Sequence, residues 1–101
     1  MQFDNVSVGK KANVFFDGKC VSHTVTLADG TRKSVGVILP STLRFDLSTK
    51  EVMEVVDGTA FVSINGASEQ SFSAGQSWTV EAGGYFIIRA QDPVHYVCHF
   101  G

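Results

Sequence analysis

Short runs of β-branched and aromatic residues, separated by glycine-containing turns, constrain the fold of this chain most strongly. Asp17-Gly18, Asp29-Gly30, Asp57-Gly58 and Asn65-Gly66 lie at or beside the ends of such runs. These dipeptides predict two-residue hairpin turns, in which both central positions need positive φ. No long window carries the 3.6-residue apolar period of a helix. The pattern therefore predicts an all-β chain.

The predicted strands are short and rich in Val, Ile, Phe and Thr. They number about nine, each bounded by Gly, Pro, Asp or Asn. A sheet of so many short strands is expected to close or roll up, because closure removes exposed edges. The predicted strands cover Val14–Phe16, Cys20–Leu27, Thr31–Leu39, Thr42–Leu47, Val52–Val56, the region of Phe61 and Ile64, Ser77–Val80, Tyr85–Ala90 and Val94–Phe100.

Length and charge indicate one domain over residues 1–101 and argue against nucleic-acid binding. A chain of 101 residues with 44% hydrophobic residues can form a single buried core without disulfide bonds or a structural metal. The net charge is −2, and the only adjacent basic pairs are Lys10-Lys11 and Arg32-Lys33. Duplex binding normally needs a clustered basic face, so no nucleic-acid partner is expected.

The start of the chain and its cysteines favour the cytoplasm. Met1–Asn5 lacks the apolar core of a signal peptide. No apolar run approaches the ~20 residues that span a bilayer, so no membrane partner is expected. Cys20 and Cys98 lie far apart in sequence and are expected to be reduced thiols, although the sequence alone leaves a disulfide open.

Two strands carry most of the polar groups. On Thr42–Leu47, Arg44 and Asp46 share one face, and alternation alone favours solvent for that face. On Val94–Phe100, His95 and His99 share a face but stand roughly 13 Å apart at about 3.3 Å per residue, too far to bind one metal together. A zinc site is therefore not expected. The sequence also contains no phosphate-binding loop or dinucleotide fingerprint.

The spacing of acidic and glycine residues resembles the two motifs of the cupin family. Glu51 stands seven positions before Gly58, and Gly75 stands eight positions before Gly83. At the positions where cupins carry metal-binding histidines, this chain has Arg44, Asp46 and Phe86 instead, as its sequence shows. This resemblance implies a cupin-like β-barrel or jelly roll. The loss of the ligands shifts the expected chemistry from metals to anions and polyols.

A more specific resemblance covers about Gly9 to Phe100. The chain is similar to the small single-domain cupins of the pyrimidine/purine nucleoside phosphorylase family. That likeness implies phosphorolysis of purine and pyrimidine nucleosides to free base and pentose 1-phosphate, with phosphate as co-substrate, no metal and no other cofactor. By analogy a homodimer is expected. The residues that carry the resemblance are Phe16, Gly18, Lys19, Ser22, Ser34–Val37, Glu51, Met53, Val55, Gly58, Gly75, Trp78, Val80, Phe86, Tyr96 and Cys98–Phe100.

The resemblance also implies site residues, because cupins point the corresponding positions into the barrel. Arg44, Asp46 and Glu51 are then expected together at one end of an apolar lumen, with Arg44 holding phosphate. Asp46 or Glu51 would act as the catalytic carboxylate, binding ribose hydroxyls or stabilising the sugar cation. Phe86 and Tyr96 would stack loosely on the base. Further substrate contacts are expected from His99 and Arg89, with Lys50 in reserve, reaching their own site or that of a neighbouring subunit.

Three other interpretations stay open at this point. The chain could be a non-enzymatic cupin that binds a small sugar or nucleoside in the same pocket. A metal-dependent cupin, such as an isomerase or dioxygenase, is disfavoured because the motif histidines are missing. The third is a structural domain in which Arg44 pairs with Asp46 on a solvated face, or with Glu51, and no ligand binds.

Overall fold

The computed structural model describes residues 2–100, which form eleven strands and one short 3-10 turn, η1 (Phe16–Gly18). Within these residues, no helix has the length and apolar character needed to cross a membrane. The strands are β1 (Ser7–Val8), β2 (Asn13–Phe15), β3 (Cys20–Thr26), β4 (Arg32–Ile38), β5 (Ser41–Asp46), β6 (Glu51–Asp57), β7 (Thr59–Ile64), β8 (Gln70–Ser73), β9 (Ser77–Val80), β10 (Tyr85–Ala90) and β11 (Val94–Phe100).

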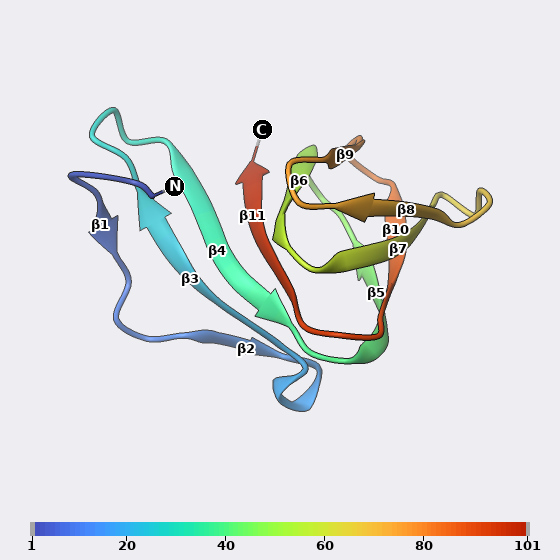
Figure 1. Cartoon of the computed structure of the whole chain (residues 1–101). Helices are drawn as coiled ribbons and strands as arrows, with labels where there is room; N and C mark the ends of the chain where they lie inside the picture. The colour runs from blue at the N-terminus through green and yellow to red at the C-terminus, as the bar shows by residue number, and fades with distance from the viewer. Residues whose placement is uncertain (1, 101) are drawn as a thin grey trace.

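The strands form two antiparallel sheets (Figure 1). The larger has seven strands in the order β1-β3-β4-β11-β6-β9, with β2 also paired to β3. The smaller has four strands in the order β5-β10-β7-β8. The chain passes between sheets several times, so β11 at the C-terminal end lies between β4 and β6 in the middle of the larger sheet.

The all-β prediction is confirmed, and the structure adds two corrections. Nine of the eleven strands correspond to predicted runs; β1 and β8 were missed because they are short and largely polar. The sheet rolls but does not close: within residues 2–100, no strand ladder joins the larger sheet to the smaller one.

The hairpin prediction was wrong in detail, because none of the four dipeptides is a two-residue loop between paired strands in the described chain. Residues 16–19 and 27–31 form the loops between β2 and β3 and between β3 and β4. Asp57-Gly58 links strands of different sheets, and Asn65-Gly66 lies within the longer β7–β8 loop. Asn65 and Gly66 do have positive φ, 50° and 78°. The length of each loop follows from which residues of the two strands pair. That pairing follows in turn from which side chains must be buried.

The core lies between the facing sides of the two sheets, where alternate residues of each strand are buried. The larger sheet contributes Val55, Trp78 and Val94, among others, and the smaller contributes Val62 and Ile88. On the inner side of β3 and β4 the buried apolar pattern gives way to Ser22 and Ser34, the two buried polar residues of the described chain. This change from apolar to polar residues marks where a ligand could be accommodated.

Candidate functional site

A groove of about 570 Å³ opens between the two sheets. Its inner wall belongs to β3, β4, β6 and β11 of the larger sheet, and its other wall to β5 and β10 of the smaller. The volume falls within the usual range for small-molecule sites. The lining residues are Asn13, Phe15, Phe16, Cys20, Ser22, Thr24, Ser34, Arg44, Phe45, Asp46, Glu51, Met53, Phe86, Tyr96, Cys98 and Phe100.

The smaller sheet gives the groove an aromatic wall. Phe45 stacks on Phe86 with ring centroids 5.0 Å apart and an interplanar angle of 19°. Phe86 in turn meets Trp78 edge-on at 5.5 Å. Phe86 is fully buried, so it supports Phe45 from behind, and Phe45 is the ring that is partly open to a ligand.

The larger sheet gives the groove a polar floor. The Asn13 side-chain amide donates to the hydroxyls of Ser22 and Thr24, at 3.4 and 3.3 Å. The Tyr96 hydroxyl lies 3.4 Å from the Cys20 sulfur. Burial raises the pKa of Tyr96 well above its ordinary value, and the contact with Cys20 adds to this. Tyr96 is therefore a neutral hydrogen-bond donor and acceptor at physiological pH.

Glu51 supplies the acidic group of this floor. The Cys98 thiol donates a hydrogen bond to Glu51 Oε1 at 3.3 Å, and Ser34 lies directly opposite Cys98 in the β4–β11 register. The pKa of Cys98 is raised, chiefly by burial and also by the negative charge of Glu51. Cys98 therefore remains a protonated donor toward the carboxylate.

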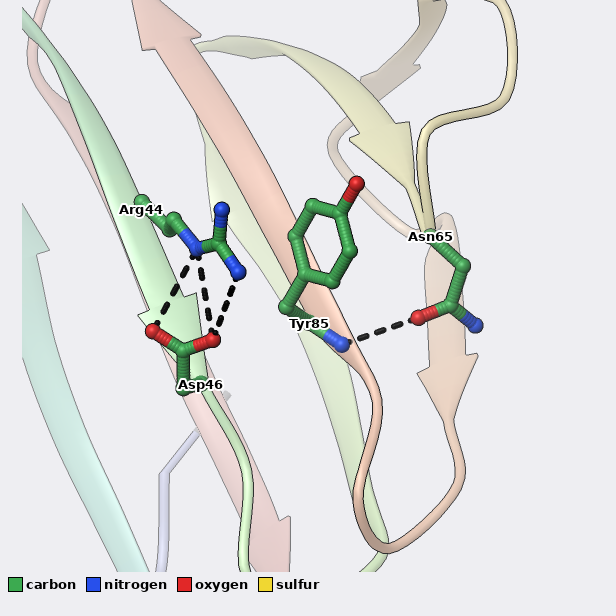
Figure 2. Close-up of polar contacts among 4 residues, drawn as sticks. All are labelled: Arg44, Asp46, Asn65 and Tyr85. Atoms are coloured by element: carbon green, nitrogen blue, oxygen red, sulfur yellow. Dashed lines mark hydrogen bonds and ion pairs between the residues drawn. The ribbon is translucent and has the colours of Figure 1, made fainter.

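Arg44 and Asp46 lie at the rim of the groove, on the outer side of β5, and Figure 2 shows their ion pair beside Tyr85. Arg44 donates from Nε to both carboxylate oxygens of Asp46, at 3.2 and 3.3 Å, and from Nη2 at 3.0 Å. Its guanidinium carbon is 4.0 Å from the centre of the Tyr85 ring on β10. The Asp46 hydrogen bond raises the pKa of Arg44 further.

The expectation that Arg44 and Asp46 point into the barrel was wrong. Their side chains are 56% and 69% exposed, whereas Phe45 between them points inward. Strand alternation decides the matter, because Leu43, Phe45 and Leu47 fill the core from one face of the strand. The Arg44–Asp46 ion pair that the sequence left open is present, but at the mouth of the groove.

Of the seven predicted site residues, five line the groove and two do not. Arg44, Asp46, Glu51, Phe86 and Tyr96 are all among its lining residues. Tyr96 contributes its hydroxyl to the groove, through the contact with Cys20, which is a different contribution from the predicted stacking surface.

Arg89 and His99 lie away from the groove. Arg89 pairs with Glu69 at 2.8 Å. His99 Nε2 lies 2.9 Å from Glu54, and its Nδ1 lies 2.8 Å from the Lys33 ammonium. His99 lines a second cavity of about 580 Å³ on the other side of the larger sheet.

Sequence reasoning missed much of the polar floor and the mouth of the groove. Asn13, Ser22 and Thr24 come from strands that sequence patterns identify but cannot place beside Glu51. Ser22 belongs to the residues that carry the family resemblance, but no role was predicted for it, and Ser22 and Thr24 also alternate with Val21, His23 and Val25 on β3. No motif pointed to Asn13.

Among residues 2–100, no group of three or more His, Cys, Asp and Glu side chains is placed to hold a metal ion. The groove lining offers two carboxylates, Glu51 on the floor and Asp46 at the rim, together with one rim arginine, neutral hydroxyl and thiol donors, and an aromatic wall.

Comparisons with known proteins give a consistent answer. The family model described as "Pyrimidine/purine nucleoside phosphorylase" matches residues 10–100. Relatives with that name from Dechloromonas aromatica and Thiobacillus denitrificans are 58% and 61% identical to this chain. Each alignment covers 99% of this chain and 98% of the relative.

Solved structures support the fold. A protein of unknown function from Acinetobacter sp. ADP1 superposes with a TM-score of 0.96 at 43% identity, covering 99% of this chain and 98% of its own. A cupin from Shewanella frigidimarina superposes with a TM-score of 0.74 at 15% identity, covering 98% of this chain and 91% of its own. The second likeness concerns the fold alone, and it agrees with the expected cupin-like architecture.

Proposed function

Because this chain belongs to the pyrimidine/purine nucleoside phosphorylase family, we propose that it cleaves purine and pyrimidine nucleosides with phosphate in the groove between its two sheets. The observation that carries this proposal is the family match over residues 10–100. The groove supports it, since one site joins an aromatic wall, a polar floor and a cation at the rim. The protein would thus be a pentosyl-transferring enzyme, a glycosyltransferase that acts on small molecules and needs no cofactor beyond phosphate as co-substrate.

The reaction breaks the bond between C1′ of the pentose and a ring nitrogen of the base. The electron pair leaves with the base, a phosphate oxygen forms the new bond to C1′, and the base takes up the proton that hydrogen phosphate gives up. Positive charge develops on the sugar on the way, as in other glycosyl transfers. We assign to Glu51 the stabilisation of this positive charge, because its carboxylate lies on the groove floor and accepts a hydrogen bond from Cys98.

Arg44 is assigned to phosphate. It is the cation among the groove-lining residues, and its Nη1 makes no hydrogen bond with residues 2–100. A guanidinium that keeps free N–H groups can bind phosphate oxygens with directed hydrogen bonds. In this assignment Asp46 orients Arg44 from the opposite side and leaves the chemistry at C1′ to Glu51.

The base is assigned to the aromatic wall, where Phe45 is backed by the buried ring of Phe86. Stacking on a ring tolerates many bases, because every base has a π-face. The neutral Tyr96 hydroxyl is placed to hydrogen-bond a polar edge of the base or sugar. Arg89 and His99 are engaged elsewhere in the chain and receive no role in this groove.

A homodimer is part of this proposal, supported by the outer side of the larger sheet. The second cavity there is lined largely by apolar residues, and Val8 and Val56 at its edge are exposed. Two facing copies would remove this surface from water. Light scattering coupled to size-exclusion chromatography tests it: a dimer gives twice the chain mass of 10.9 kDa, and a monomer at working concentrations contradicts it.

We place the enzyme in the cytoplasm, supported by its two free thiols, Cys20 and Cys98, which are both buried. Reduced cysteines are the rule in that compartment. Fractionation of cells that produce the protein would test the location. Recovery with secreted or envelope proteins would contradict it.

The function is tested by base release from uridine, inosine and adenosine by the purified protein, with and without phosphate. Release that depends on phosphate for purine and pyrimidine nucleosides is expected. If the protein binds these nucleosides but releases no base at high protein concentration, the alternative of a non-enzymatic nucleoside-binding cupin replaces the proposal.

A further inference from the structure

The turn at the mouth of the groove has an unusual backbone. Phe16 and Asp17 both have φ of 53°, and Gly18 follows with φ of 89°. Positive φ is natural for glycine, but it is costly for a bulky aromatic residue and marks a genuine outlier. The turn is closed by the Lys19 N–H, which donates to the Phe16 carbonyl at 3.1 Å.

Core packing does not account for this conformation. None of the residues in η1 is buried, and Phe16 remains 43% exposed. Its aromatic neighbour in the described chain is Phe45, met edge-on at 5.2 Å with an interplanar angle of 71°. An apolar ring held partly in water by a strained backbone suggests a functional constraint, because such strain persists only where the surrounding structure imposes it.

The position of Phe16 indicates the constraint. Its ring lines the groove and adjoins Phe45, which stacks on the buried Phe86. Phe16 therefore ends an aromatic row that runs from the core to the open mouth. A flat ligand lying against Phe45 would reach the exposed part of Phe16, and binding would remove that part from water.

We propose that Phe16 is a specificity-determining residue that covers the nucleobase from the groove mouth, with the strained turn holding its ring in place. The inference rests on the proposed function and extends it to base selection. Contact with the Phe16 ring does not depend on the hydrogen-bonding groups at the edge of the base, so purines and pyrimidines can both make it. A purine presents more ring area and gains more from the contact.

Phe16→Ala tests the inference, with Phe61→Ala as the matched control. Phe61 is a partly buried ring on β7 that lies under Arg89, away from the groove. Loss of one stacking contact corresponds to roughly 5- to 150-fold in affinity. Phe16→Ala is expected to raise KM by about that factor, more for inosine than for uridine, with KM for phosphate unchanged. Phe16→Trp should restore nucleoside affinity, and Phe61→Ala should behave as the parent protein.

A binding measurement separates this inference from the proposed function. Inosine affinity is measured by calorimetry without phosphate, so no turnover is needed. Weaker binding by Phe16→Ala alone supports the inference even if the parent protein proves to be no phosphorylase. Unchanged inosine affinity and KM in Phe16→Ala would overturn it, and so would an equal rise in KM for phosphate.

The strain itself has a separate readout. Phe16→Gly removes the ring and also the cost of positive φ, whereas Phe16→Ala removes only the ring. The glycine variant is expected to unfold at a higher temperature than the alanine variant, the reverse of the usual order. A lower midpoint for Phe16→Gly would contradict a strained turn.

Discussion

The Cys98 thiol donates a hydrogen bond to the Glu51 carboxylate at 3.3 Å across neighbouring strands of the larger sheet. The two side chains come from β11 and β6, so the contact exists only when the sheet is assembled. It fixes one oxygen of the carboxylate that we assign to the developing sugar cation.

Replacing Cys98 should therefore change catalysis more than binding. A net hydrogen bond is worth about 0.5–1.5 kcal/mol, or roughly 2- to 12-fold. Cys98→Ala should lower kcat by about that factor with little change in KM, whereas Cys98→Ser keeps a donor and most of the activity. Glu51→Gln should lower kcat much further. Steady-state kinetics on uridine check all three, and equal activity of Glu51→Gln and the parent would refute the role of Glu51.

The chain offers a matched pair of arginines on the smaller sheet. Arg44 pairs with Asp46 and lies over Tyr85, whereas Arg89 pairs with Glu69 and lies over Phe61. Exposed ion pairs contribute little to stability, so both alanine variants should unfold near the parent temperature.

Of these two alanine variants, only Arg44→Ala is expected to lose phosphate-dependent turnover. Arg44→Lys should recover only part of the turnover, because lysine keeps the positive charge but lacks the planar guanidinium that binds two phosphate oxygens at once. Initial rates over a series of phosphate concentrations provide the measurement. Full activity in Arg44→Ala, or an equal loss in Arg89→Ala, would contradict the assignment.

Gly36 permits the close contact that shapes the groove floor. A Cβ added there would lie 2.5 Å from the Val21 carbonyl oxygen and 2.9 Å from the Tyr96 hydroxyl. Gly36→Ala should lower the free energy of unfolding by about 1–3 kcal/mol, as overpacking does, and should weaken nucleoside binding by displacing Tyr96. Gly9→Ala is the control, since its Cβ would meet the Thr24 carbonyl at an ordinary 3.7 Å. Urea unfolding that shows equal stability for both variants would contradict this packing.

Strand patterns in the sequence predicted the faces of individual strands well. On β11, alternation correctly put Tyr96 and Cys98 on one face and His95 and His99 on the other. On β5, alternation favoured an exposed Arg44, and the family motif wrongly favoured an inward one. The apolar neighbours decide, because Leu43 and Phe45 must be buried.

What the sequence could not give was the pairing between distant strands. Cys98 and Glu51 are 47 positions apart, and no local pattern states that β11 lies beside β6. The strained Phe16 turn was hidden for a related reason: positive φ at a phenylalanine opposes the local preference of the residue. A feature that opposes the local preference of its own residues in this way can be recognised only in the folded chain.

The buried thiols and the phenol predict alkaline sensitivity. Folding raises the pKa of Cys20, Cys98 and Tyr96 above their ordinary values of 9.0, 9.0 and 10.0. Above about pH 9 the unfolded chain therefore releases protons that the folded chain retains, and the free energy of unfolding falls as pH rises. Below pH 8 these groups are protonated in both the folded and the unfolded chain, so they do not make the free energy of unfolding depend on pH.

Thermal unfolding between pH 7.5 and pH 10.5 (a range chosen to bracket these ordinary values) measures this effect. The Cys98→Ala variant should lose stability less steeply than the parent above pH 9, because one such group is gone. Parallel curves for the two proteins would show that Cys98 does not keep its proton on folding.

The central claim is that phosphate, and not water, receives the pentose in this groove. The most direct measurement is phosphorus NMR of uridine and phosphate incubated with the purified protein, with released uracil counted in parallel. One pentose 1-phosphate for each uracil is the predicted result. Uracil with free pentose, or no uracil at all, would contradict the account.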